Sequence, residues 1–123
     1  MTRFHHIIVK TFLVLAWLAG PTIAQPFVPG FADLPLAPGL ELPSAPTLQF
    51  DSPLGRIIET YGTGTGTPEE IMPFYQKSLQ ALGWKIQEPG KFLRDGELLE
   101  IDVFDADTRP IVRFRLTPVT RKP

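Results

Sequence analysis

Hydrophobic and charged residues alternate along the last third of the chain, in residues 97–105 and 110–117. A period of two is typical of a strand with one buried face. With Ala106–Arg109 as the loop of a hairpin, apolar residues oppose one another on one face and opposite charges on the other. The predicted pairs are Leu99–Leu116, Ile101–Phe114 and Val103–Val112 on the first face, and Glu100–Arg115 and Asp102–Arg113 on the second. A shift by one residue would spoil both sets, so the pattern fixes the register.

Turn residues divide the preceding segment into short strands. A Pro-Gly pair and an Asp-Gly pair separate the runs 84–87, 91–94 and 97–105, and Asp-Gly is a strong signal for a tight hairpin. This hairpin places Leu93 opposite Leu98 on the charged face. Two adjacent leucines there are either incidental or mark a place where another segment or a second molecule docks.

A helix is predicted between residues 68 and 82. Thr67 can act as N-cap, Pro68 suits the first helical position, and Glu70 would complete a capping box. Gly83 is a natural stop, whereas Pro73 removes one backbone hydrogen bond, so we expect a bend or a tight first turn there. Apolar residues recur at helical spacing at Ile71, Phe74, Tyr75, Leu79 and Leu82.

The order of these elements predicts an α+β domain over residues 54–118. A strand at 55–61 precedes the helix and four strands follow, so one helix would pack on one face of an antiparallel sheet. A body of 65 residues is small for a stable core, and the chain has no cysteine with which to form a disulfide. We therefore expect additional burial from the segment before it or from self-association. Residues 119–123 would form a C-terminal tail.

Residues 25–53 form a proline-rich arm before this domain. The arm holds seven prolines and only three charges, a composition that forbids a helix, makes a central strand unlikely and favours an extended chain. It is also rich in large apolar residues, which are unfavourable in a solvated linker. We expect the arm to lie on its own domain or on a partner. The predicted interaction surface consists of Phe27, Phe31, Leu34, Leu36, Leu40 and Leu42 of the arm, together with Leu93 and Leu98.

The N-terminus has the pattern of a secretory signal at residues 1–24. Arg3 and Lys10 provide a positive start, and a short apolar run, 11–20, follows. Small residues at Thr22 and Ala24 predict cleavage after Ala24, which would place the protein in the periplasm or outside the cell. The alternative is an uncleaved membrane anchor beginning near residue 7, although His5, His6 and Lys10 fit poorly in a membrane span.

Removal of this leader changes the available chemistry. Both histidines of the protein lie in it, at His5 and His6, and the chain has no cysteine. The mature chain therefore lacks the residues of Cys and Ser–His nucleophiles and of the usual zinc sites. Loss of Arg3 and Lys10 leaves 10 Lys and Arg against 13 Asp and Glu, a formal charge of −3. This balance is atypical of nucleic-acid binders.

The remaining candidates for chemistry each have an ordinary structural explanation. Asp102, Asp105 and Asp107 are spaced loosely like cation ligands, but a calcium loop needs more ligands and a turn glycine. The run 62–67 alternates Gly and Thr before the helix, which resembles a phosphate loop, yet no Gly-Lys-Ser/Thr follows and a flexible connection is favoured. The candidates for a catalytic carboxylate pair are Glu59, Glu69, Glu70, Glu97 and Glu100. The aromatic candidates for a ligand pocket are Phe74, Tyr75 and Trp84, for which a place in the core is favoured.

Three phrases of the sequence carry a resemblance to other proteins. They are FDSPLGRIIE at 50–59, FYQKSLQALGW at 74–84 and KFLRDGELLEIDV at 91–103. With them the chain resembles small exported alphaproteobacterial proteins of uncharacterised function. The second phrase joins a helix to a strand, so the resemblance implies packing positions and no catalytic residue.

These observations together predict a non-enzymatic, exported module that binds through its arm or sheet face. The expected partner is a protein of the cell envelope or a second copy, with no nucleic acid, cofactor or metal, and with membrane contact only if the leader is retained. The alternative is a carrier with a small-molecule pocket between helix and sheet.

Overall fold

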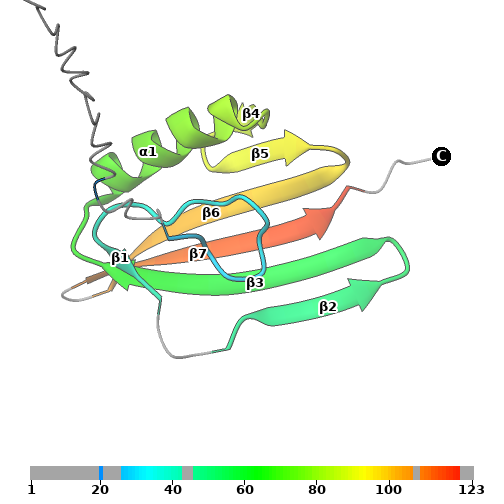
Figure 1. Ribbon diagram of the computed structural model, residues 1–123, viewed down its shortest axis with the longest axis horizontal. Coiled ribbons are helices and arrows are strands. Elements are labelled where there is room, and N and C mark those ends of the chain that lie inside the picture. The colour runs from blue at the N-terminus through cyan, green and yellow to red at the C-terminus, as the bar shows by residue number, and fades with distance from the viewer. Residues whose placement is uncertain (1–19, 21–25, 43–45, 107–108, 120–123) are drawn as a thin grey trace, which may run out of the picture.

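One helix packs against one antiparallel sheet of seven strands, which confirms the predicted α+β class (Figure 1). The structure is a computed structural model that describes residues 20, 26–42, 46–106 and 109–119. The elements, in chain order, are β1 (Leu40–Glu41), β2 (Leu48–Ser52), β3 (Gly55–Gly64), α1 (Pro68–Ala81), β4 (Lys85–Glu88), β5 (Lys91–Arg94), β6 (Glu97–Ala106) and β7 (Arg109–Pro118). The predicted leader, except Gly20, its cleavage site and the tail beyond Val119 lie outside the described residues.

The sheet follows the order β1-β3-β7-β6-β5-β4, and β2 pairs with the same side of β3 as β1 does. The β6–β7 register agrees with the prediction at each of the five predicted pairs, and it continues into the predicted loop, where Ala106 pairs with Arg109. The β5–β6 register also agrees, with Leu93 opposite Leu98. The central contact is non-local, because β3 pairs with β7, with Ile58 opposite Leu116.

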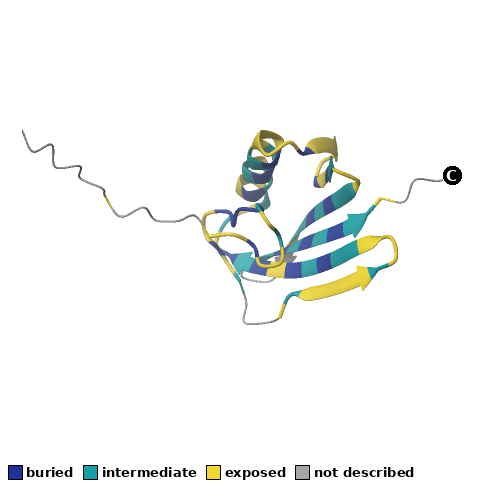
Figure 2. Cartoon of the chain, turned by 45° about the vertical axis from the view of Figure 1, so that its right-hand side comes forward, coloured by how far each residue is buried: buried dark blue, intermediate teal, exposed yellow. Residues whose placement is uncertain are grey.

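The core lies on one face of the sheet. In Figure 1 the helix and the loop of the arm both lie over this face, and the buried positions of the strands alternate along their length as a half-buried sheet requires (Figure 2). The sheet contributes Ile58, Phe92, Leu99, Ile101, Val112, Phe114 and Leu116; the helix and its C-terminal end contribute Ile71, Tyr75, Leu79 and Trp84; the arm contributes Val28, Leu34, Leu36, Ala37 and Leu40.

α1 begins and ends where the sequence predicts, but one predicted contact at its N-terminus is not formed. Thr67 occupies the N-cap and Pro68 follows it, but Thr67 makes no side-chain capping bond, so the predicted capping box is wrong. The Thr67 carbonyl accepts from the N–H of Glu70 (3.0 Å) and of Ile71 (2.9 Å), and the first turn is otherwise open to water. At the other end, Gly83 adopts a φ of 88°. Its N–H bonds the Gln80 carbonyl while that of Trp84 bonds the Leu79 carbonyl, as in a Schellman motif.

The arm is more structured than an extended chain. Residues 26–36 double back, since Phe27 pairs with Pro35 and the N–H of Leu36 bonds the Pro26 carbonyl (2.9 Å). The segment then adds β1 and β2 to the sheet, so the expected boundary after residue 53 falls in the turn of the β2–β3 hairpin. The unexpected strand, β2, lies at an edge, where the flanking prolines do no harm.

The Gly-Thr run is a strand over its first half, and not wholly the flexible connection that we predicted. β3 continues to Gly64, where β1 pairs with it and Leu40 lies opposite Gly64. A Cβ atom at Gly64 would lie 2.1 Å from the Gly39 carbonyl oxygen. Glycine is therefore required at residue 64 because the arm backbone approaches the sheet backbone directly.

Candidate interaction surface

Most of the predicted arm residues pack on the chain's own core. Leu34, Leu36 and Leu40 are buried, and Phe31 and Leu42 are partly buried against the same cluster. Only Phe27 keeps a large exposed fraction, 55%. These residues therefore stabilise the domain, and the three buried leucines are unavailable to a partner while the arm is in place.

The Tyr75 hydroxyl joins the arm to the helix. It donates a hydrogen bond to the Pro35 carbonyl (2.9 Å) and accepts one from the Ala37 N–H (3.0 Å). Its ring packs edge-on against Phe74 and Phe114, with centroids 5.1 and 5.4 Å away. Burial raises the pKa of the Tyr75 hydroxyl, which keeps its proton for the bond to Pro35.

Arg94 makes a second connection between arm, helix and sheet. Its guanidinium donates to both carboxylate oxygens of Asp33, at 2.8 and 3.0 Å, and to the Leu82 carbonyl at the end of α1, at 2.9 Å. It also lies 4.3 Å from the ring centroid of Trp84. The hydrogen bond from Arg94 lowers the pKa of the Asp33 carboxyl. The contact between Arg94 and Asp33 was not predicted from the sequence, because 61 positions separate the two residues.

The sheet face opposite α1 and the arm, called the open face below, carries the side chains that the core does not use. Its middle is a ladder of charges. Asp102 accepts a 2.6 Å hydrogen bond from Arg113, and the Tyr61 hydroxyl donates one of 2.6 Å to Glu59. The hydrogen bond to Asp102 raises the pKa of Arg113. Glu100 lies opposite Arg115, as predicted from the alternation.

An apolar row crosses the open face beside this ladder. It runs across the strands β5, β6, β3 and β2 as Leu93, Leu98, Ile57 and Phe50, with Thr117 of β7 between Leu98 and Ile57. Leu93, Leu98 and Ile57 are half-buried, and Phe50 is 59% exposed. The predicted pair of leucines is therefore one end of a longer row, which the sequence did not reveal because β2 and β3 are distant from it along the chain.

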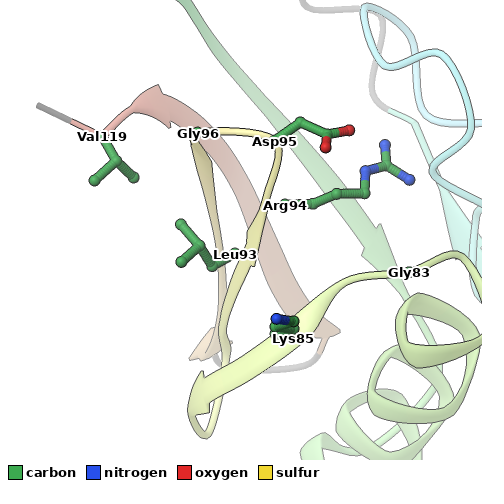
Figure 3. A pocket seen from close by; sticks show the side chains of 7 residues that line it. All are labelled: Gly83, Lys85, Leu93, Arg94, Asp95, Gly96 and Val119. Carbon is green, nitrogen blue, oxygen red and sulfur yellow. The ribbon is translucent and has the colours of Figure 1, made fainter. Parts of the chain in front are cut away.

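A hollow lies at the leucine end of the row. It has a volume of about 420 Å³ and is lined by Lys85, Leu93 and Val119 among others. Figure 3 shows the Leu93 and Val119 side chains pointing to the same side of the β5–β6 hairpin, while Arg94 extends away from them. The hollow opens to solvent, and both apolar and charged residues line it.

The catalytic and metal-binding candidates are dispersed in the structure. Glu97 pairs with Arg56 on the core side (2.9 Å), whereas Glu59 and Asp102 pair with arginines on the open face. The side chain of Asp105 and the whole of Asp107 lie outside what is described. Within the described ranges, no three Asp, Glu, His or Cys side chains gather closely enough to hold a metal ion.

The predicted pocket between helix and sheet is occupied by core side chains, notably Tyr75 and Phe114. A groove of about 420 Å³ lies instead between the arm and the outer side of the helix, lined by Phe27, Phe74 and Leu82. No helix in the described part of the chain is both long and apolar enough to cross a membrane.

Comparisons with known proteins identify no relative of the chain. No protein-family model, curated protein or solved structure matches the chain.

Proposed function

We propose that the chain is a non-enzymatic, exported module that binds a protein of the cell envelope through the open face of its sheet. The observation that carries this proposal is the apolar row, which stays partly exposed on a face that no described segment covers. Export is supported by the signal-like pattern of residues 1–24. The absence of histidine and cysteine after residue 24 supports a binding role over catalysis.

The distribution of charge favours a protein as the partner. The open face places acidic and basic residues next to each other, as in the Arg113–Asp102 and Arg115–Glu59 pairs. A nucleic acid would favour a continuous basic surface, whereas a protein interface commonly combines an apolar centre with polar surroundings. The apolar row beside a ladder of paired charges has this second composition.

Site-directed photo-crosslinking in the native host tests the proposal. A photoreactive phenylalanine analogue would replace Leu98 in the full chain, and Ile86 would carry it in the control. Ile86 is a suitable control because it is exposed on β4 and belongs to the opposite side of the sheet. We expect a protein adduct of defined mass from position 98 alone. Equal adducts from both positions, or none from position 98, would refute a role for the open face.

A carrier function is the second candidate, and the groove beside α1 favours it. Phe27 is exposed in that groove although it is a large apolar residue, and Phe74 faces it from the helix. Native mass spectrometry of protein purified from its host would show a retained small molecule. Phe27→Ala should lower its occupancy, whereas Leu98→Thr on the open face should not. A chain with the bare polypeptide mass in every preparation would exclude this function.

A further inference from the structure

The edge strands β4 and β2, on opposite sides of the sheet, differ in how they are protected. β4 has features that discourage further pairing, since it carries Lys85 and Glu88 and its register shifts between Ile86 and Glu88. β2 is less protected, because it pairs with β3 without a shift from Leu48 to Ser52 and carries one charge, Asp51. In Figure 1 no described segment lies beyond it. A regular edge that carries a single charge is suited to receive another strand.

The backbone groups that β2 presents at this edge follow from its turn. The two-residue turn after Ser52 makes Ser52 and Gly55 a hydrogen-bonded pair, and such pairs alternate along an antiparallel ladder. Phe50 and Leu48 therefore bond to β3. The N–H and C=O groups of Gln49 and Asp51 point away from β3 and are the groups available to an added strand.

We propose that a second copy of the chain occupies this edge, with its β2 antiparallel to the first about a two-fold axis. The available backbone groups pair in a register that places Phe50 opposite Phe50 of the other copy. Each Gln49 then faces Asp51 of the other copy, so an amide lies against each carboxylate and no like charges meet. The two phenylalanines, 59% exposed in the single chain, would cover each other on the open face.

The strand itself is self-complementary, which is why a second copy fits better than an unrelated strand. When two copies of Gln49-Phe50-Asp51 lie antiparallel, the Gln49 amide of each copy faces the Asp51 carboxylate of the other. The two Phe50 rings face each other between them. Pairing ends where Pro53 lacks an N–H. About four backbone hydrogen bonds result, so we expect a weak, concentration-dependent dimer. The dimer adds to the proposed function and does not depend on it.

Disulfide crosslinking through a single introduced cysteine tests the geometry of the proposed dimer, because the chain has no cysteine of its own. Residues opposed in a non-hydrogen-bonded antiparallel pair lie close enough for a disulfide. We expect purified mature chain carrying Phe50→Cys to form a disulfide dimer under mild oxidation at least ten times faster than Leu54→Cys. Leu54 is the matched control, since it is 68% exposed in the adjoining turn. Equal rates for the two variants would overturn the proposal.

A charge series at residue 49 tests the register. Gln49→Lys would face Asp51 of the other copy and should tighten the dimer about threefold or more in sedimentation equilibrium, whereas Gln49→Glu should weaken it by a similar factor. Gln49 is exposed, so both variants should retain the unfolding midpoint of the parent chain. Shifts in the same direction would refute this register. The disulfide and sedimentation experiments use purified chain and test only the dimer. A negative result in them is therefore distinct from a negative result of photo-crosslinking at Leu98, which tests the proposed function.

Discussion

Arg94 and Asp33 form a two-pronged ion pair, with both carboxylate oxygens of Asp33 within 3.0 Å of the guanidinium. The same guanidinium bonds the Leu82 carbonyl and stacks on Trp84. One side chain thus connects the arm, the end of the helix and the sheet. The pair is partly exposed, with side-chain exposures of 24% and 39%, so water screens part of its strength.

Arg94→Ala should lower the free energy of unfolding by about 2 kcal/mol, since charged hydrogen bonds are lost together with the stacking on Trp84. Urea denaturation measures this loss. Lys91→Ala is the matched control, because Lys91 pairs with the exposed Glu88, at 3.4 Å. Its effect should stay below about 0.5 kcal/mol. Similar losses in both variants would contradict a special role for Arg94.

The lowered pKa of Asp33 makes stability depend on pH in the acid range. The ionised carboxylate is stabilised in the folded chain, so its contribution is complete above the ordinary pKa of 3.8 and is lost as pH falls through the lower folded value. Unfolding midpoints between pH 7 and pH 2 should therefore decline below roughly pH 4. Asp33→Asn should be less stable at pH 7 and should show a shallower decline. A decline as steep as that of the parent would assign the effect to other carboxylates.

Tyr75→Phe isolates the contribution of one buried hydroxyl, because the ring contacts to Phe74 and Phe114 remain. The variant leaves the Ala37 N–H and the Pro35 carbonyl without their partner, at a cost of about 1–3 kcal/mol. Hydrogen exchange should show faster exchange of the Ala37 amide. An Ala37 amide as protected as in the parent would show that the arm is held by other contacts.

The same hydroxyl predicts an alkaline limit to stability. Burial raises the pKa of Tyr75 in the folded chain above its ordinary value of 10.0. Its contribution is therefore complete below pH 10 and is lost as pH rises toward the folded value. The parent chain should lose stability above about pH 10 more steeply than Tyr75→Phe does. Parallel curves for the two chains would contradict this assignment.

Gly64→Ala should cost about 2–3 kcal/mol, because its Cβ would overlap the Gly39 carbonyl and force the arm away from β3. Gly62→Ala is the matched control in the same strand, since its Cβ would meet its nearest atoms at 3.6 Å, an ordinary contact. That variant should remain within about 0.5 kcal/mol of the parent. Thermal unfolding of the two proteins distinguishes the positions.

The sequence predicted the local parts of the fold well. The β6–β7 and β5–β6 registers follow from alternation and from the Asp-Gly turn, since both strands of each hairpin are visible in one stretch of sequence. β3 was predicted too short because glycine is rare inside strands, and Gly64 is there only because Gly39 lies against it. β2 was missed because the flanking prolines, Pro46 and Pro53, and its exposure on both faces hide the signal of a strand.

On the open face, the alternation predicted the charged pairs of β6 and β7, but of the apolar row it predicted only Leu93 and Leu98. The apolar composition of the arm indicated burial but not what would bury it, and the answer depends on contacts such as Tyr75–Pro35 that leave no periodicity in the sequence. The row from Leu93 to Phe50 depends on the pairing of β3 with β7, which is likewise invisible to local patterns. Deletion of residues 25–53 would remove core residues and two strands, so point variants are the better test of function.

The pairing of β3 with β7 also determines when the interior can form. A chain synthesised or threaded through a membrane emerges from its N-terminus, so the arm appears first and the last strand, Arg109–Pro118, appears at the end. Until that strand arrives, Ile58 has no Leu116 opposite it, and the core lacks Val112, Phe114 and Leu116. The face of β3 that enters the core is therefore completed only after the last strand of the sheet, β7, has joined it.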